Sequence, residues 1–266
     1  MANSRMLQNA PLVEVIAEVH WTLSESGLVP RQSFEPSWFD LERELRGPFT
    51  ALLPHVETLH QAGFSVPLEM LGRTPIIRYR ASPGGWPLAQ LGQGLLTVNA
   101  TPPYDGWERV GELLRMLLVA GIDGSPAFRA IRLEKLQLQY RDAFTAHHGV
   151  EDTKSFFLDN VRSFSREPLS TLDKLVVPES IEASGELTFV IKEPRNAQAT
   201  IRFTHGQRTD SQEPVPAAVI DFIIVSREMA STLDIGSVMN WFNMAHDATW
   251  AMFQGVVPDA TRKRLE

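Results

Sequence analysis

One order of elements, found twice along the chain, constrains the fold more than any other feature of this sequence. In each half the residue patterns predict a strand, a helical stretch, three short strands and a long amphipathic helix. The opening strands, at 11–21 and 131–144, alternate apolar and polar side chains, as half-buried strands do. The long helices begin near Asp105 and Ile235, and their apolar residues recur with the 3.6-residue period. Only the order repeats, because the residues of the two halves do not match one by one.

The repeated order predicts an α+β fold of two similar halves, residues 1–124 and 125–266. Each half consists of a strand, a helix, three antiparallel strands and a long helix. We expect one continuous curved sheet, or two antiparallel sheets, with a long helix lying on each half. This arrangement is similar to the TBP-like and helix-grip folds, and the similarity concerns the fold alone.

Local signals predict the remaining elements. Asp105 and Glu108 have the spacing of a capping box for the first long helix, and Gly121 is the glycine expected at its end. Gly47-Pro48 is expected to separate two helices. The other predicted helices are 37–46, 50–62 and 152–164, the other predicted strands are 75–81, 86–91, 95–100, 186–192, 199–204 and 217–226, and a connector is expected at 165–184.

Composition and charge exclude several classes of protein. With 43% hydrophobic and 21% charged residues the chain resembles folded globular proteins, which excludes wholesale disorder. Its apolar runs are far shorter than a membrane span, and its first residues lack the apolar core of a signal peptide. We therefore expect no membrane association and a cytoplasmic location. The absence of cysteine excludes disulfides and thiolate sites, and the net charge of −7 disfavours non-specific binding of nucleic acid.

Three segments are similar to one protein family. Residues 9–19 resemble the first strand of an uncharacterised, sporadically distributed bacterial family of about this length. The strand at 132–141 and the last helix around 245–247, followed by a short helix near Pro258, resemble the same family. Members often carry an arginine where this chain has Gln139. The resemblance implies no assigned activity, and the patchy distribution of the family implies an accessory or defence-associated role.

Motifs of the common enzyme classes are missing from the sequence. No glycine-rich loop leads into Lys-Ser or Lys-Thr, so no phosphate-cradling loop is predicted. The Gly-x-Ser-x-Gly elbow of serine hydrolases and the Glu-x-Lys of common metal-dependent nucleases are also absent. We therefore favour a protein without catalytic activity, and we predict no cofactor.

Glu14, Glu18 and His20 form the first candidate site. They lie on one face of the first strand, about 7 Å apart for every two residues. Two carboxylates and an imidazole are ligands for a divalent metal and also form an acid–base pair, which would suit a metal-dependent hydrolase. The alternative, which we favour, is a solvated sheet face on which a neighbouring element covers Ile16.

Tyr140, Arg141 and His246 form the second candidate site, for a small ligand bound between the long helices and the sheet. Tyr140 and Arg141 are expected on opposite faces of their strand. His246 lies among aromatic residues of the last helix, where a histidine is able to contact a ligand or sense pH. The alternative for His246 is a residue at the core boundary that donates one hydrogen bond to a neighbouring loop.

Arg78, Arg80 and Arg132 offer a third possibility, because neighbouring guanidinium groups bind an anion through bidentate contacts. Alternating arginines on a strand also pair with acidic cross-strand neighbours, and Glu14 and Glu18 are available for this. We favour the second interpretation.

The leading hypothesis is a non-catalytic binding or interaction protein, with a protein partner or with self-association. The alternative is a small-ligand-binding protein with its pocket between the long helices and the sheet, and a metal-dependent hydrolase comes third. Core packing is expected to account for most of the six tryptophans, and a few at an edge would suit a protein interface, where tryptophan is enriched.

Overall fold

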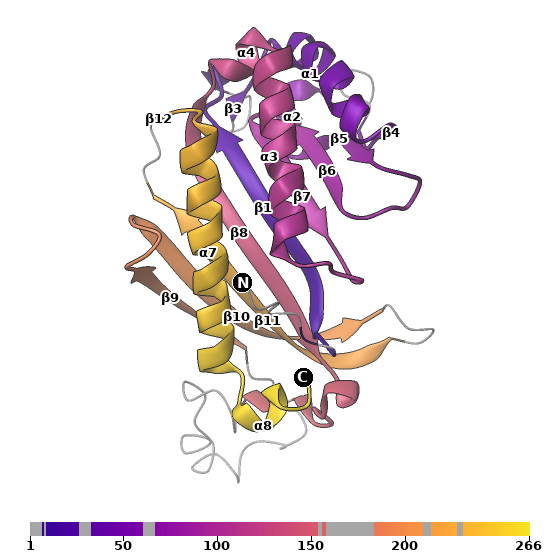
Figure 1. Cartoon of the computed structure of the whole chain (residues 1–266), viewed down its shortest axis with the longest axis vertical. Coiled ribbons are helices and arrows are strands. Elements are labelled where there is room, and N and C mark those ends of the chain that lie inside the picture. Colours follow the sequence, from indigo (N-terminus) through magenta and orange to yellow (C-terminus); the bar gives the residue numbers. More distant parts are fainter. Residues whose placement is uncertain are drawn as a thin grey trace.

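The computed structural model describes residues 7, 9–26, 33–60, 67–153, 156–157, 184–209, 214–227 and 231–266. A ten-stranded sheet with helices packed on it forms the body of the protein, which confirms the α+β class (Figure 1). In spatial order its strands are β4 (His55–Thr58), β5 (Pro75–Arg80), β6 (Leu88–Gly92), β7 (Leu95–Ala100), β1 (Leu12–Trp21), β8 (Arg132–Phe144), β11 (Val215–Ser226), β10 (Ala197–Arg208) and β9 (Gly185–Ile191). β12 (Ser231–Thr232) also pairs with β8, and β2 (Glu25–Ser26) pairs with β3 (Ser33–Phe34) in a separate ribbon.

The helices differ in length and position. The long ones are α1 (Trp38–Leu52), α3 (Trp107–Gly124) and α7 (Ile235–Val256). α3 and α7 lie in front of the sheet in Figure 1, and α1 packs beside α3. The short helical turns are α2 (Leu68–Leu71), α4 (Pro126–Arg129), η1 (Ala146–His148) and α8 (Asp259–Arg262).

β1 and β8 form the central pair of the sheet. They run antiparallel, with Ala17 opposite Leu138 and Glu18 opposite Gln137. Strands from residues 55–100 lie beyond β1, and strands from residues 185–226 lie beyond β8. The sheet is therefore continuous between the two halves of the chain, because these two strands pair with each other.

The apolar side of the period-two pattern faces the helices. Val15, Ala17 and Val19 of β1 are fully buried, and they belong to one core with Leu117 of α3 and Phe242 of α7. Glu14, Ile16 and Glu18 alternate with them and are only partly buried. The alternation of the sequence thus matches the two faces of the strand, and residues of both chain halves share one core.

A strand replaces the helix predicted at 50–62. α1 continues through Gly47 and Pro48 to Leu52, where the predicted break was wrong, and residues 55–58 form β4 beside β5. Pro54 favours the end of the helix, because proline disfavours the helical region for a preceding residue that carries a Cβ, as Leu53 does and Gly47 does not. Leu53 is extended, with φ −134° and ψ 85°.

The predicted ends of α3 were also wrong. The helix begins at Trp107 with Gly106 as its N-cap, so Asp105 and Glu108 do not have the positions of a capping box. Gly121 does not end the helix, which continues to Gly124. Its lack of a side chain serves packing instead, because a Cβ there would lie 2.7 Å from the ring of Phe128.

The strands predicted in the second half are present, and those at 199–204 and 217–226 are extended by several residues as β10 and β11. The predicted strand at 86–91 begins later, at Leu88. Most of the helix predicted at 152–164, and nearly all of the connector at 165–184, lie outside the described residues. Within the described ranges, no helix is both long enough and apolar enough to cross a membrane.

Candidate functional site

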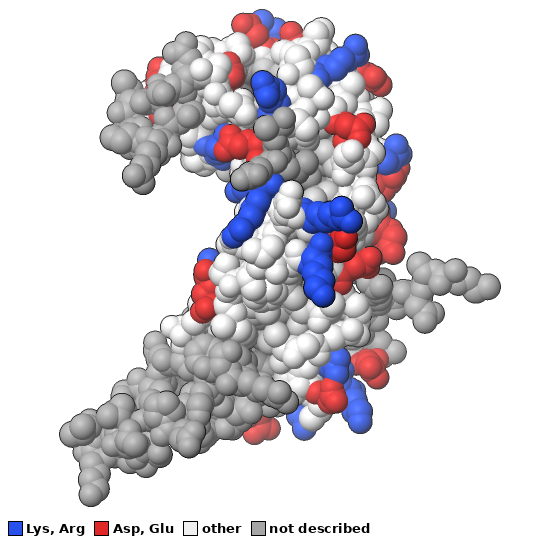
Figure 2. Space-filling model, turned by 90° about the vertical axis from the view of Figure 1, so that its left-hand side faces the viewer, with Lys and Arg blue, Asp and Glu red and all other residues white. Residues whose placement is uncertain are grey.

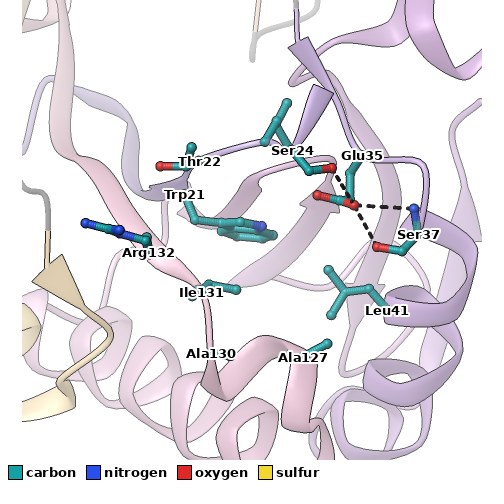
Figure 3. Close-up of a pocket in the computed structure, with 11 residues that line it drawn as sticks. Trp21, Thr22, Ser24, Glu35, Ser37, Leu41, Ala127, Ala130, Ile131 and Arg132 are labelled. Carbon is teal, nitrogen blue, oxygen red and sulfur yellow. Dashed lines mark hydrogen bonds between the residues drawn. The ribbon is translucent and has the colours of Figure 1, made fainter. Parts of the chain in front are cut away.

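A pocket of about 300 Å³ opens where β1 ends (Figure 3). Its walls come from the end of β1 and the residues after it, the start of α1, and the link between α4 and β8. The lining residues are Trp21, Thr22, Leu23, Ser24, Glu35, Ser37, Leu41, Ala127, Ala130, Ile131 and Arg132. Three separate stretches of sequence thus converge on one cavity.

Trp21 occupies the centre of the pocket in Figure 3. The backbone N–H of Trp21 donates to the Gly94 carbonyl at 3.1 Å, and its ring meets Phe128 edge to face at 5.6 Å between centroids. Gly94 adopts φ +62° in the turn between β6 and β7, and a Cβ there would lie 2.8 Å from the Trp21 carbonyl oxygen. This glycine allows the turn to approach the strand closely, and the Gly94 carbonyl can then accept the hydrogen bond from the Trp21 backbone.

The rim of the pocket carries two charged residues, Glu35 and Arg132, on opposite sides of Trp21 (Figure 3). The Glu35 Oε1 atom accepts from the hydroxyls of Ser24 and Ser37, at 3.1 and 2.6 Å. Among the described residues, Glu35 Oε2 accepts no hydrogen bond. The Arg132 guanidinium likewise forms no ion pair with any residue that the structure describes. Each group therefore retains capacity for a ligand.

Gln93 fixes the Glu35 side of the rim. Its buried amide oxygen accepts from the Glu35 backbone N–H at 2.8 Å, and its amide nitrogen donates to the Leu68 carbonyl at 2.8 Å. On the other side, the backbone N–H of Thr22 donates to the Arg132 carbonyl at 2.9 Å. These bonds set the separation of the two charged residues.

Two of the three predicted ligand residues meet, 106 positions apart in sequence. The Tyr140 hydroxyl of β8 lies 2.9 Å from Nδ1 of His246 on α7. Tyr104 extends the chain, with its hydroxyl 3.1 Å from that of Tyr140, and Trp107 stacks on the His246 ring at 5.5 Å. These side chains hold α7 and the start of α3 against β8, in a region separate from the pocket around Trp21.

Burial controls the chemistry of this tyrosine pair. It raises the pKa of Tyr140 well above the ordinary value, with the nearby phenol of Tyr104 adding to the effect. Burial likewise raises the pKa of Tyr104. Both phenols therefore stay protonated at neutral pH, and Tyr140 is able to donate to the His246 ring while it accepts from Tyr104.

Arg141 points to the opposite sheet face, into a ladder of alternating charge. Its Nε donates to Asp221 Oδ1 at 2.7 Å, and this hydrogen bond raises the pKa of Arg141. Glu14 lies opposite Arg141 on β1, Arg202 lies opposite Asp221 on β10, and Glu186 lies opposite Arg202 on β9. Figure 2 likewise shows both signs interspersed on the side that it presents, unlike the basic stripe typical of nucleic-acid binding.

The predicted metal ligands divide into two hydrogen-bonded groups. His20 Nε2 lies 2.8 Å from Glu18 Oε2, whereas Glu14 Oε1 accepts from the Asn99 amide at 2.8 Å. Across the residues that the structure describes, no three His, Asp or Glu side chains are placed to hold a metal ion.

The structure places Arg78 and Arg80 together and Arg132 apart from them. Arg78 and Arg80 both donate to Glu57, at 3.2 and 3.1 Å, so their acidic partner is on β4 and not on β1. The expected pairing with an acidic neighbour is confirmed, but Glu14 and Glu18 are not the partners. The reason is that β4, predicted as helix, lies directly beside β5. Arg132, by contrast, lines the pocket around Trp21.

Asp142 is a buried carboxyl that the sequence patterns did not single out. It lies opposite Leu12 and Ile220 in the sheet and is 6% exposed. Burial and the nearby Asp221 carboxylate raise its pKa, Arg208 opposes the shift, and the resulting pKa is about 7. Within the described chain, no hydrogen bond to its carboxyl group offsets this burial.

No protein-family model matches this chain, and no curated protein is significantly similar to it. The site has therefore to be judged from its own geometry.

Tyr140→Phe tests the hydrogen-bonded chain. We expect it to lower the free energy of unfolding by about 1–3 kcal/mol, because Tyr104 and His246 both lose a buried partner. Tyr79→Phe is the matched control: the Tyr79 hydroxyl is buried and has no hydrogen-bond partner among the described residues, so its removal should be neutral or stabilising. Urea unfolding measures the free energy of unfolding of both variants. Equal losses in the two would contradict a stabilising role for the hydrogen bonds of Tyr140.

Asp142→Asn tests the pH dependence of stability. Between an unfolded pKa of about 3.9 and the folded pKa of about 7, the folded state holds a proton that the unfolded state releases. The free energy of unfolding should therefore fall as pH rises through this window, by up to about 1.4 kcal/mol per unit, and level off above it. The variant should lack this slope, whereas Asp40→Asn, at an exposed carboxylate on α1, should keep it. An unchanged slope in Asp142→Asn would show that another group is responsible.

Proposed function

We propose that this protein is a non-catalytic binding protein that holds a small ligand in the pocket around Trp21. The observation that carries the proposal is an apolar cavity with the available Glu35 Oε2 on one side and the exposed Arg132 side chain on the other, its guanidinium directed away from Trp21 in Figure 3. Ligand sites combine such apolar walls with a few polar groups that fix orientation. The pocket lies at the end of β1, and not between the long helices and the sheet where the sequence led us to expect it.

The ligand that fits this pocket is a small zwitterion with an apolar body. A cationic group satisfies Glu35, an anionic group satisfies Arg132 as the planar guanidinium favours, and Leu41, Ile131 and Trp21 contact the apolar part. A free amino acid with an aliphatic or aromatic side chain has this chemistry, and its size suits about 300 Å³.

The pocket chemistry favours binding over catalysis. The described lining includes two serines, and both of their hydroxyls bind the Glu35 carboxylate. It includes no histidine or lysine that would act as a general base beside them. The accessory or defence-associated role remains a proposal that rests on the family resemblance alone.

We also infer that the two halves are an internal duplication with a TBP-like or helix-grip arrangement. The strand order supports this, because β5-β6-β7-β1 on one side matches β9-β10-β11-β8 on the other. Along the chain α3 follows β7, and α7 follows β11 after the short strand β12. In this correspondence β9 takes the place of β5.

Calorimetry with single apolar amino acids tests the proposed function. We expect at least one to bind, and its N-acetyl and methyl-ester forms, which each lack one charge, to bind at least about tenfold more weakly. Arg132→Gln should weaken binding by a similar factor. Arg109→Gln, at an exposed arginine of α3 outside the pocket lining, should bind as the unaltered protein does. Failure of every amino acid to bind below about 1 mM, or equal binding by both variants, would refute the proposal.

A further inference from the structure

β9 forms one edge of the sheet. Its only described neighbour is β10, which it meets from Gly185 to Ile191. The strand lies at the margin of the ribbon in Figure 1. Its outer side therefore presents a row of backbone N–H and C=O groups that no described strand pairs.

The side chains of β9 are unusually apolar for an edge. Leu187, Phe189 and Val190 are 38%, 41% and 60% exposed. Between Glu186 and Lys192 the strand carries no charge and no proline, which are the usual protections of an edge strand. An apolar strand with an open edge is a surface to which another strand adds.

The opposite edge of the sheet is protected. There the short strand β4 covers β5, and its Glu57 binds both Arg78 and Arg80. β9 has the place that β5 has on the other side of the β1–β8 pair, but within the described residues it has no outer neighbour. The comparison indicates that a strand belongs beside β9.

We propose that this strand is β9 of a second copy of the chain, paired antiparallel about a two-fold axis at Phe189. Residues opposite each other in an antiparallel pair point to the same sheet face. In this register Phe189 meets the partner's Phe189, and Leu187 meets the partner's Ile191 on the same face. On the other face Thr188 meets the partner's Val190. The two open edges thus form one continuous sheet with an isologous interface.

Charge complementarity selects this register. With the axis at Phe189, Glu186 lies opposite the partner's Lys192, and the reverse pair repeats across the axis. Lys192 is exposed and has no ion pair among the described residues, whereas Glu186 accepts from Arg202 at 3.0 Å and gains a second cation. An axis at Thr188 places Glu186 opposite Val190 instead, and leaves Lys192 without an acidic partner.

Single cysteines test the register, because the chain has no cysteine of its own. Phe189→Cys places two thiols directly opposite each other. Their Cα atoms are then about 4.5–5.5 Å apart, a separation that a disulfide spans. Leu187→Cys is the matched control, because the offset of four residues separates its two thiols by about 13 Å. Mild oxidation should give a disulfide-linked dimer of Phe189→Cys and none of Leu187→Cys. Cross-linking of Leu187→Cys alone would overturn the proposed register.

Light scattering of the intact, unaltered chain tests the dimer itself. We expect twice the chain mass, and loss of the dimer in Phe189→Lys, which buries two like charges at the axis. Phe39→Lys, at a phenylalanine of α1 with 47% exposure, should stay dimeric. Circular dichroism confirms that each variant is folded. A monomer at about 100 μM, or a dimer that a folded Phe189→Lys retains, would overturn the proposal. The test does not involve the pocket around Trp21, so it is independent of the proposed function.

Discussion

The antiparallel pairing of β1 with β8 is the interaction on which the rest of the structure depends. It joins strands that are more than a hundred residues apart in sequence and makes one sheet of the two chain halves. Because β1 ends beside the start of β8, Trp21 and Arg132 line the same pocket. Because the two strands share a face, Glu14 lies opposite Arg141 and begins the charge ladder. The pocket and the charge ladder are consequences of one register.

Local sequence patterns predicted which helices and strands exist better than where each one ends or which strand lies beside it. The alternation in β1 and from Leu136 to Arg141 of β8 reported the two sheet faces correctly, since burial on one face is a local property of a strand. It failed before Leu136, because the β1–β8 pairing shifts register between His20 and Trp21 and Leu133 is buried in the same core as Leu136. Pro54 lies near the first turn of the helix predicted at 50–62, yet it ends α1, because proline fits both situations and only packing decides between them. That error concealed β4, and with it the true partner of Arg78 and Arg80.

The candidate site shows where a single sequence stops being informative. Tyr140 and His246 were selected for their chemistry, and they do meet, because an amphipathic helix after the last strand packs on the sheet that contains Tyr140. The pocket around Trp21 carries no local signal. Its two charges come from a loop before α1 and from the first residue of β8, and only tertiary pairing brings them together. Asp142 was missed for the same reason, since its burial depends on neighbours distant in sequence.

Native-state hydrogen exchange tests the central role of the β1–β8 pair most directly. If this pair unites the halves, the amides of Val15 to Val19 and of Leu136 to Leu138 exchange only by global unfolding, and so do those of β7 and β11. The free energies from these four strands should then coincide with the value from denaturant unfolding. A set of lower and equal values confined to β5–β7 and β1, or to β8–β11, would show that one half opens without the other, and would contradict the account.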